Sequence, residues 1–226
     1  MTTSTGTDRP IHQGQPILHR GAPLDTAQAV MLLVHGRGAT AESILTLEPE
    51  LHRPGWAYLA PQARGNAWCP LSFLAPLAQN EPYLSSALAA LDDIVSHVLN
   101  AGLPSDKLVL LGFSQGACLA LEYAARHTRR YGGLVGLSGG LIGPDGTPRD
   151  YPGSLDGTPV FLGCSDIDPH IPKQRVLDTE VWLRHLGADV TARLYPGMGH
   201  TINQNEIDAV RALMARVDGP ASAPTG

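Results

Sequence analysis

The chain has 226 residues, a length within the range of a single α/β domain. Charged residues make up 16% of it and the formal net charge is −5, so the balance excludes the basic surface of a nucleic-acid-binding protein. A hydrophobic fraction of 43% excludes a disordered chain, and no apolar run is long enough for a membrane span. We expect a soluble protein with one domain over residues 11–217, between loose ends at 1–10 and 218–226.

The cysteines and the N-terminal region predict a cytoplasmic location. Cys69, Cys118 and Cys164 are scattered without a Cys-x-x-Cys spacing, and an odd, sparse count favours a reducing compartment. The polar residues 1–16 lack the apolar segment of a secretory signal.

Short apolar runs alternate with segments of helical spacing. In chain order we predict an edge strand at 15–19, a strand at 29–34, a short helix within 40–54, a strand at 56–60, a helix at 82–100, a strand at 107–113, a helix marked by Ala117, Ala120, Leu121 and Ala124, strands at 133–137 and 159–163, a helix marked by Val176, Val181 and Leu186, a strand at 190–195 and a helix at 207–217. This alternation predicts an α/β fold, with a mostly parallel sheet and helices on both faces. Almost every residue is used, so no cap domain is expected. Because ligands bind beyond the carboxyl ends of such strands, the functional residues are sought there.

Ser114 follows the strand at 107–113 in the sequence Gly112-Phe113-Ser114-Gln115-Gly116, directly before a helix. Gly-x-Ser-x-Gly in a strand-turn-helix context predicts a sharp turn that exposes the serine hydroxyl as a nucleophile. A serine hydroxyl needs a base, held in place by a third group.

The base and its partner are expected after the last two strands. His200 lies in the glycine-rich loop between the last strand and the last helix, and we predict that it is the base. Asp166 and Asp168 both follow the strand at 159–163. We favour Asp168 as the partner because Pro169 biases its backbone away from helix, and we expect Asp166 to shape the loop through backbone N–H groups. The chain order Ser114, Asp168, His200 is that of α/β-hydrolases.

Two backbone N–H groups are expected to hold the oxyanion of the reaction. One belongs to Gln115, the residue after the nucleophile. The other belongs to Arg37, in the loop His35-Gly36-Arg37-Gly38 after the strand at 29–34. No second residue at a ligand spacing accompanies His35, so we expect this histidine to brace the loop and predict no metal site.

Five motifs together resemble a known family. They are Leu33-Val-His-Gly-Arg-Gly38, Gly112-Phe-Ser-Gln-Gly-Ala117, Leu137-Ser-Gly-Gly140, Asp168-Pro-His-Ile-Pro172 and Gly197-Met-Gly-His200. In this order, over about residues 15–217, the chain resembles the phospholipase/carboxylesterase family of α/β-hydrolases, which includes acyl-protein thioesterases. The resemblance implies a serine hydrolase of carboxylic esters or thioesters that needs no cofactor, with Ser114, His200 and Asp168 as its triad.

The chain departs from the thioesterase pattern at two places. Gly163-Cys164 stands where those proteins often have His-Gly, which is more similar to the small bacterial esterases of the group. The segment 64–74 also differs, and we expect it to overhang the site. The predicted substrate pocket is formed by Trp68, Phe73 and Leu74 from this segment, together with Phe113, although packing within the loop is the alternative for the segment's residues.

The sequence therefore predicts a serine carboxylesterase for small or short-to-medium-chain esters. The alternative is an acyl-protein thioesterase or lysophospholipase acting on long acyl chains. The expected partner is a small-molecule ester, and a homodimer is compatible with the sequence. Two interpretations remain open for the Arg37 side chain. It either contacts a substrate carboxylate or points outward into solvent.

Overall fold

The computed structural model of the chain describes residues 11–218, and a seven-stranded sheet forms its centre. The strand order is β1-β3-β2-β4-β5-β6-β7, and every neighbouring pair is parallel except β1 with β3. The strands are β1 (Ile17–Gly21), β2 (Ala29–Val34), β3 (Trp56–Pro61), β4 (Leu108–Phe113), β5 (Gly133–Leu137), β6 (Pro159–Ser165) and β7 (Asp189–Tyr195). The predicted α/β class, with an edge strand at its start, is confirmed.

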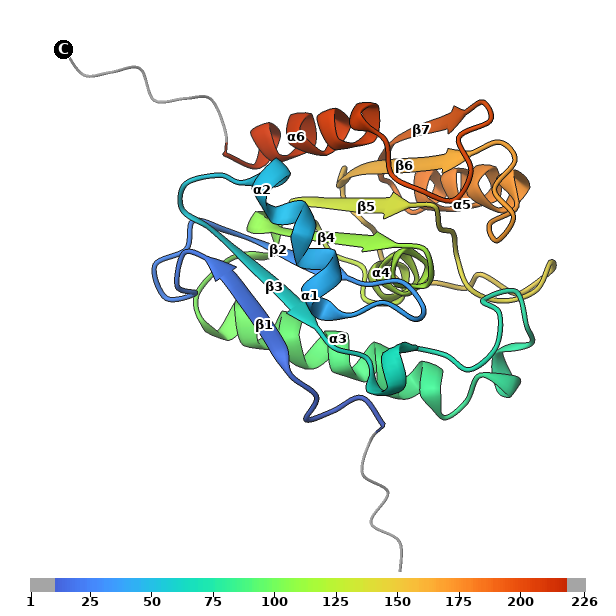
Figure 1. Cartoon of the computed structure of the whole chain (residues 1–226), viewed down its shortest axis with the longest axis horizontal. Helices are drawn as coiled ribbons and strands as arrows, with labels where there is room; N and C mark the ends of the chain where they lie inside the picture. Colours follow the sequence, from blue (N-terminus) through green and yellow to red (C-terminus); the bar gives the residue numbers. More distant parts are fainter. Residues whose placement is uncertain (1–10, 219–226) are drawn as a thin grey trace, which may run out of the picture.

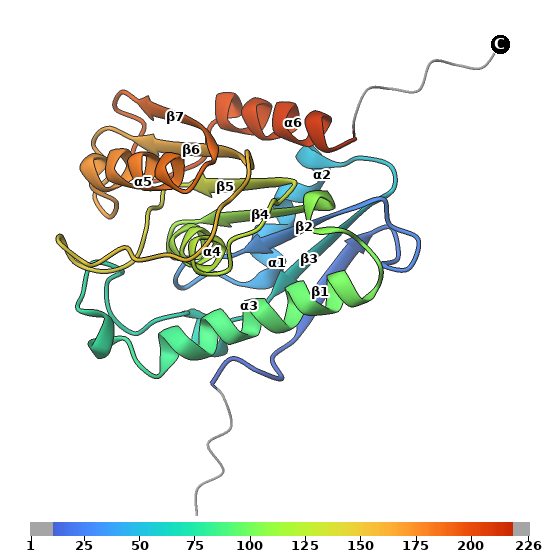
Figure 2. The same cartoon turned by 180° about the vertical axis from the view of Figure 1, so that it is seen from behind.

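Helices cover both faces of the sheet (Figures 1 and 2). One face carries α1 (Ala41–Ile44), α2 (Glu48–Leu51) and α6 (Gln204–Asp218). The other face carries α3 (Tyr83–Asn100), α4 (Gln115–Arg126) and α5 (Lys173–His185). Among residues 11–218, no helix is both long and apolar enough to cross a membrane. Of the expected loose ends, residues 1–10 and 219–226 lie outside the described part.

The apolar sequence of β2 explains its central position. Successive strand residues point to opposite faces, so Val30 and Leu32 belong to the core on the side of α3 and α4, while Met31 and Leu33 belong to the core on the side of α1 and α6. All six residues of β2 are buried, as a strand with helices on both faces requires.

Two predicted helices differ in detail from the structure. The segment 40–54 forms two one-turn helices separated by a 3₁₀ turn, and Thr40 caps the first of them, accepting a hydrogen bond from the Ser43 N–H at 3.1 Å. In α5, Val181 is 65% exposed instead of facing the core. The spacing of five residues from Val176 to Val181 turns Val181 away from the sheet, and Leu183 occupies the buried face instead.

Glu206, in the first turn of α6, is a carboxylic acid buried in the core. Its backbone N–H donates to Asn203 Oδ1 at 2.9 Å, and its Oε2 accepts from the Asn203 N–H at 2.9 Å, which caps the helix. Its Oε1 has no hydrogen-bond partner among the described residues. Burial raises the pKa of Glu206 to about 7, an effect that the Asn203 hydrogen bond only partly offsets.

The Glu206→Gln variant is expected to be more stable than the wild type at alkaline pH. In the unfolded chain the carboxyl ionises near 4.5, but in the folded protein only near 7. Between these values the folded state keeps a proton that the unfolded state has lost, so wild-type stability falls as pH rises, by about 3 kcal/mol in total. Glutamine has the same shape and no charge, so the advantage should appear at about pH 8 and vanish at about pH 4.

Urea unfolding across this pH range measures the difference between the two proteins. Asp208→Asn is the matched control, because Asp208 lies in the same helix but is exposed. A difference that does not change with pH would show that folding does not raise the pKa of Glu206.

Candidate functional site

The three residues of the expected triad meet at the carboxyl edge of the sheet. Ser114 follows β4, Asp168 follows β6 and His200 follows β7. Because these strands are parallel, their carboxyl ends lie on the same side of the molecule, and β5 is the one strand between β4 and β6. Residues separated by up to 86 positions are thereby brought together.

Ser114 occupies a strained turn between β4 and α4. Its φ of 55° and ψ of −122° are unfavourable for a residue with a side chain, at a cost of about 1–3 kcal/mol. The glycines on either side make the turn possible. A Cβ at Gly112 would lie 2.3 Å from the Gly116 carbonyl oxygen, and one at Gly116 would lie 2.1 Å from the Val34 carbonyl oxygen. The motif therefore needs both glycines because the backbone passes too close for any side chain.

A continuous hydrogen-bonded relay joins the three side chains. His200 Nε2 lies 2.9 Å from Ser114 Oγ, and His200 Nδ1 lies 2.7 Å from Asp168 Oδ2. A carboxylate only accepts, so Nδ1 carries the proton and Nε2 is free to accept from the serine hydroxyl. This is the tautomer that a general base requires.

The environment of Asp168 keeps it ionised. Burial alone would raise the pKa of Asp168, but hydrogen bonds from His200 and from the N–H groups of His170 and Ile171 outweigh burial and lower it. The two N–H groups donate to Oδ1 at 2.8 and 3.0 Å, which leaves Oδ2 for His200. The Asp168 side chain is inaccessible to solvent.

Asp166 connects the loops that carry Asp168 and His200. Its Oδ1 accepts from the Gly197 N–H at 2.9 Å, while Ser165 Oγ accepts from the Gly199 N–H at 3.1 Å. Asp166 is therefore placed to shape the histidine loop and does not contact the His200 ring, which is the division of roles expected from the sequence.

The backbone N–H groups of Arg37 and Gln115 flank Ser114, as expected for oxyanion donors. Gln115 begins α4, where N–H groups lack helical partners. The loop with Arg37 passes so close that a Cβ on Gly36 would lie 3.2 Å from Ser114 Cβ. Within residues 11–218, neither N–H donates to another backbone group.

His35 fixes the direction of the Arg37 N–H. The buried ring accepts at Nε2 from the Ala63 N–H at 3.0 Å, so Nδ1 carries the proton and donates to the Gly36 carbonyl at 2.8 Å. In a trans peptide the carbonyl and the following N–H point in opposite directions, so this bond turns the Arg37 N–H away from His35. Burial lowers the pKa of His35, which favours its neutral form. This is the bracing role predicted for His35.

Trp68 does not line a pocket, contrary to our expectation. Its side chain is fully buried, and its indole N–H donates to the His35 carbonyl at 2.9 Å. Its backbone N–H donates to Gln115 Oε1 at 2.8 Å. An indole needs a partner for its one polar group when buried, and the backbone of the loop that carries Arg37 provides that partner. Trp68 thus supports the loop from behind.

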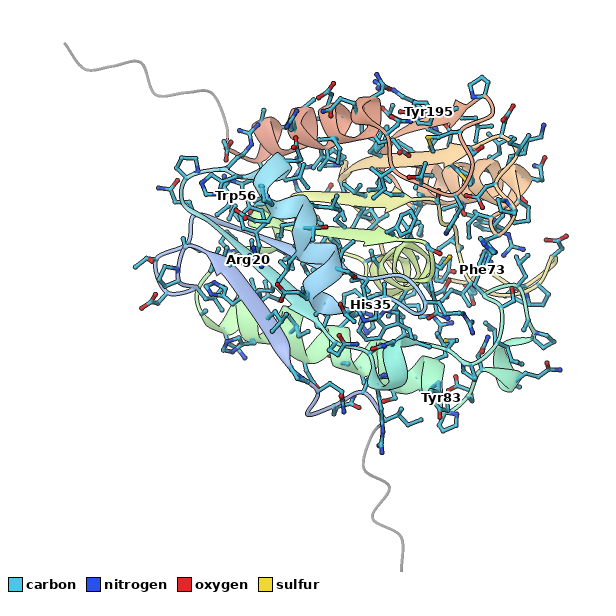
Figure 3. All side chains as sticks on the ribbon, viewed as in Figure 1. Arg20, His35, Trp56, Phe73, Tyr83 and Tyr195 are labelled. Carbon is cyan, nitrogen blue, oxygen red and sulfur yellow. The ribbon has the colours of Figure 1, made fainter. Side chains whose placement is uncertain are left out.

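A cavity of about 400 Å³ opens beside Ser114. It is lined by Arg37, Ser72, Phe73, Ser114, Gln115, His170, Ile171 and His200. Of the predicted pocket residues only Phe73 is among them, and Figure 3 shows it beyond the carboxyl ends of the strands. Leu74 packs against the core instead, and Phe113 packs its ring against that of His200, with centroids 5.0 Å apart.

Three lining residues, Ser72, His170 and Ile171, were not predicted from the sequence. The last two lie within the motif Asp168-Pro-His-Ile-Pro172, directly after the expected acid. This position was the available signal, because a loop that brings Asp168 to His200 also brings its next residues there. The His170 ring stands edge-on to the His200 ring, with centroids 4.8 Å apart.

Residues 69–73 include the lining residues Ser72 and Phe73, and we call this segment the wall of the cavity. Hydrogen bonds to its main chain hold the wall in place. The five successive carbonyls each accept a bond from another part of the chain: Cys69 from Gln115 Nε2, Pro70 and Leu71 from the Arg37 guanidinium, Ser72 from Asn80 Nδ2, and Phe73 from the Gly143 N–H. The course of residues 69–73 is therefore set by donors from other parts of the chain.

The cysteines are unsuited to nucleophilic chemistry. Cys69, Cys118 and Cys164 are buried, and burial raises the pKa of each thiol to about 12. Cys118, one turn into α4, is a small core residue. Among residues 11–218, no group of three or more His, Cys, Asp or Glu side chains is arranged to hold a metal ion.

Comparison with known proteins gives a consistent result. A family model described as Phospholipase/Carboxylesterase matches residues 21–217. Acyl-protein thioesterase 1 of Gibberella zeae is 32% identical over 127 residues, which are 55% of this chain and 54% of that protein. The protein of the same name from Saccharomyces cerevisiae is 23% identical over 222 residues, which are 88% and 97% of the two chains. For Gibberella zeae, Neurospora crassa and Debaryomyces hansenii, the match spans about half the length of the relative.

A solved structure extends the similarity over nearly the whole chain. The phospholipase/carboxylesterase of Dyadobacter fermentans is 40% identical, with a TM-score of 0.86, over 89% of this chain and 96% of its own. At this level of identity the likeness covers the family as well as the fold.

Proposed function

Because the chain belongs to the phospholipase/carboxylesterase family of α/β-hydrolases, we propose that it is a serine carboxylesterase acting on small or short-to-medium-chain esters. The observation that carries the proposal is the relay from Ser114 through His200 to Asp168 at the floor of an open cavity. A hydroxyl, a base in the correct tautomer and two oxyanion donors are the groups that acyl transfer needs.

In the first stage His200 Nε2 takes the proton of Ser114 Oγ while the oxygen attacks the ester carbonyl carbon. The negative charge on the carbonyl oxygen is held by the N–H groups of Arg37 and Gln115, each typically worth about 3 kcal/mol. Asp168 stabilises the imidazolium through Nδ1–H. The bond to the alcohol then breaks, and His200 gives its proton to the leaving oxygen.

In the second stage a water molecule takes the place of the alcohol. His200 accepts a proton from this water, and the water oxygen attacks the acyl carbon. The same donors hold the second oxyanion. The acid then leaves, and the proton returns from His200 to Ser114 Oγ.

The lining of the cavity supports a short acyl chain. Only Phe73 and Ile171 among its lining residues have apolar side chains. Each methylene buried against apolar surface stabilises a complex by about 0.8 kcal/mol. A long acyl chain would gain little of this energy, because beyond these two side chains it meets polar groups or solvent.

A series of 4-nitrophenyl esters from acetyl to palmitoyl, compared with an octanoyl thioester, tests the proposal. We expect kcat/KM to be largest for the short acyl groups and to fall for decanoyl and longer chains. A rise through palmitoyl, or a clear preference for the thioester, would instead support the activity named in the fungal relatives, acyl-protein thioesterase. Absence of hydrolysis of every member would contradict both.

A further inference from the structure

Arg37 brings a fixed positive charge to the cavity of Ser114. Its guanidinium donates from Nη1 to the Pro70 carbonyl at 2.7 Å and from Nη2 to the Leu71 carbonyl. Both acceptors are neutral, and within residues 11–218 no carboxylate forms an ion pair with Arg37. Arg37 is exposed to solvent, as one of its two expected positions implies, but these bonds hold its side chain at the cavity and no carboxylate of the described residues neutralises it.

The rest of the cavity adds no negative charge to oppose it. None of the lining residues is an Asp or a Glu. The nearby carboxylate of Asp168 is inaccessible and already bonded to His200 and two backbone N–H groups. The cavity is therefore electropositive, in a chain whose net charge is −5. A guanidinium has five N–H donors, so the two carbonyl bonds leave donors for a carboxylate.

The strand order places Arg37 and His200 on opposite sides of Ser114. Ser114 follows β4, His200 follows β7 on one side of it, and Arg37 follows β2 on the other side. His200 must protonate the leaving oxygen, so the alcohol lies on the His200 side. The oxyanion points to the N–H groups of Arg37 and Gln115, so the acyl substituent takes the remaining direction, away from His200 and into the cavity that Phe73 and the Arg37 side chain also line.

We propose that the preferred substrate is a half-ester of a short dicarboxylic acid, whose free carboxylate binds the Arg37 guanidinium while Ser114 attacks the ester carbonyl. The inference rests on the proposed esterase function and specifies its substrate class. Only a few carbon atoms separate the two carboxyl carbons, because the same residue supplies an oxyanion N–H and the guanidinium. One water is consumed, its oxygen enters the new carboxylate, and the products are the dicarboxylate and the alcohol.

Monoethyl glutarate and its neutral isostere ethyl 4-carbamoylbutanoate form the test pair, with ethanol release measured by chromatography. We expect the wild type to favour the carboxylate in kcat/KM by about tenfold or more, and to lose part of this preference at high salt. Arg37→Met should bring the ratio close to one, and Arg37→Lys should retain part of it. The ratio is internal to each variant, so any general loss from a disturbed loop cancels.

Arg64→Met is the matched control, because it removes the same charge from an exposed position outside the cavity and should leave the ratio unchanged. A wild-type ratio near one, with both esters hydrolysed, would overturn the inference and leave the esterase proposal intact. Calorimetric binding of glutarate to Ser114→Ala separates the two further. Suppose that the wild type hydrolyses no ester, while Ser114→Ala binds glutarate and Ser114→Ala with Arg37→Met does not. This result would support the anion site and reject the esterase proposal. Absence of binding would count against the anion site.

Discussion

Replacing Ser114 by Ala is expected to lower kcat for short-chain esters by a factor of about 10⁴ to 10⁶. The variant keeps the fold and the two oxyanion N–H groups but has no atom to bond to the acyl carbon. It should also fail to react with a fluorophosphonate probe, which labels only an activated serine. Mass spectrometry of the labelled wild type should locate the adduct on Ser114.

Ser138→Ala is a matched control for this experiment. Ser138 also follows a strand, β5, and also has a positive φ, of 50°. It is fully buried, however, so no probe reaches its hydroxyl. We expect labelling of Ser138→Ala to equal that of the wild type. Equal labelling of Ser114→Ala would show that another residue is the nucleophile.

Asp168→Asn is expected to lower kcat by a factor of about 10³ to 10⁴. The reason is the direction in which the new amide must point. The N–H groups of His170 and Ile171 donate to Oδ1, so the amide oxygen stays there and the NH₂ group turns toward His200. His200 Nδ1 then has to accept, its proton moves to Nε2, and Nε2 cannot accept the proton of Ser114.

Asp166→Asn is the comparison that assigns the two carboxylates. Its amide oxygen still accepts from the Gly197 N–H, so the His200 loop keeps its support. We expect less than about a tenfold loss of kcat, since this side chain does not touch the base. Steady-state kinetics on one butyryl ester, with urea midpoints to verify folding, measures both variants. The opposite ranking would exchange their roles.

The sequence predicted the sheet well because its strands are buried on both faces. Such strands are continuous apolar runs, and those at 29–34 and 133–137 match β2 and β5 residue for residue. The same pattern predicted where Ser114, Asp168 and His200 lie, since Ser114 comes directly after β4 and the other two lie in the loops that follow β6 and β7. Searching beyond the carboxyl ends of the strands works well here because the strands themselves are predicted well.

The cavity walls were less predictable because they belong to a loop without periodicity. An aromatic residue in such a loop can face a ligand or the core. Phe73 lines the cavity, whereas Trp68 is fully buried in the core. The difference depends on partners distant in sequence. Trp68 is drawn inward by the His35 carbonyl, 33 positions away. The prediction that Val181 faces the core was wrong for a different reason. The apolar periodicity of α5 is weak, and its buried positions include Arg175 and Thr179.

The five bonded carbonyls of residues 69–73 have a consequence for how this site can change in evolution or by design. The course of the wall is set by main-chain atoms and by donors located elsewhere, such as Gln115 and Asn80. The Ser72 side chain is exposed and lines the cavity, and its hydroxyl bonds only locally, accepting from the Leu74 N–H at 3.2 Å. Substitution of Ser72 should therefore alter which esters fit while Ser114 and the N–H groups of Arg37 and Gln115 keep their positions, so that selectivity can change without loss of the proposed chemistry.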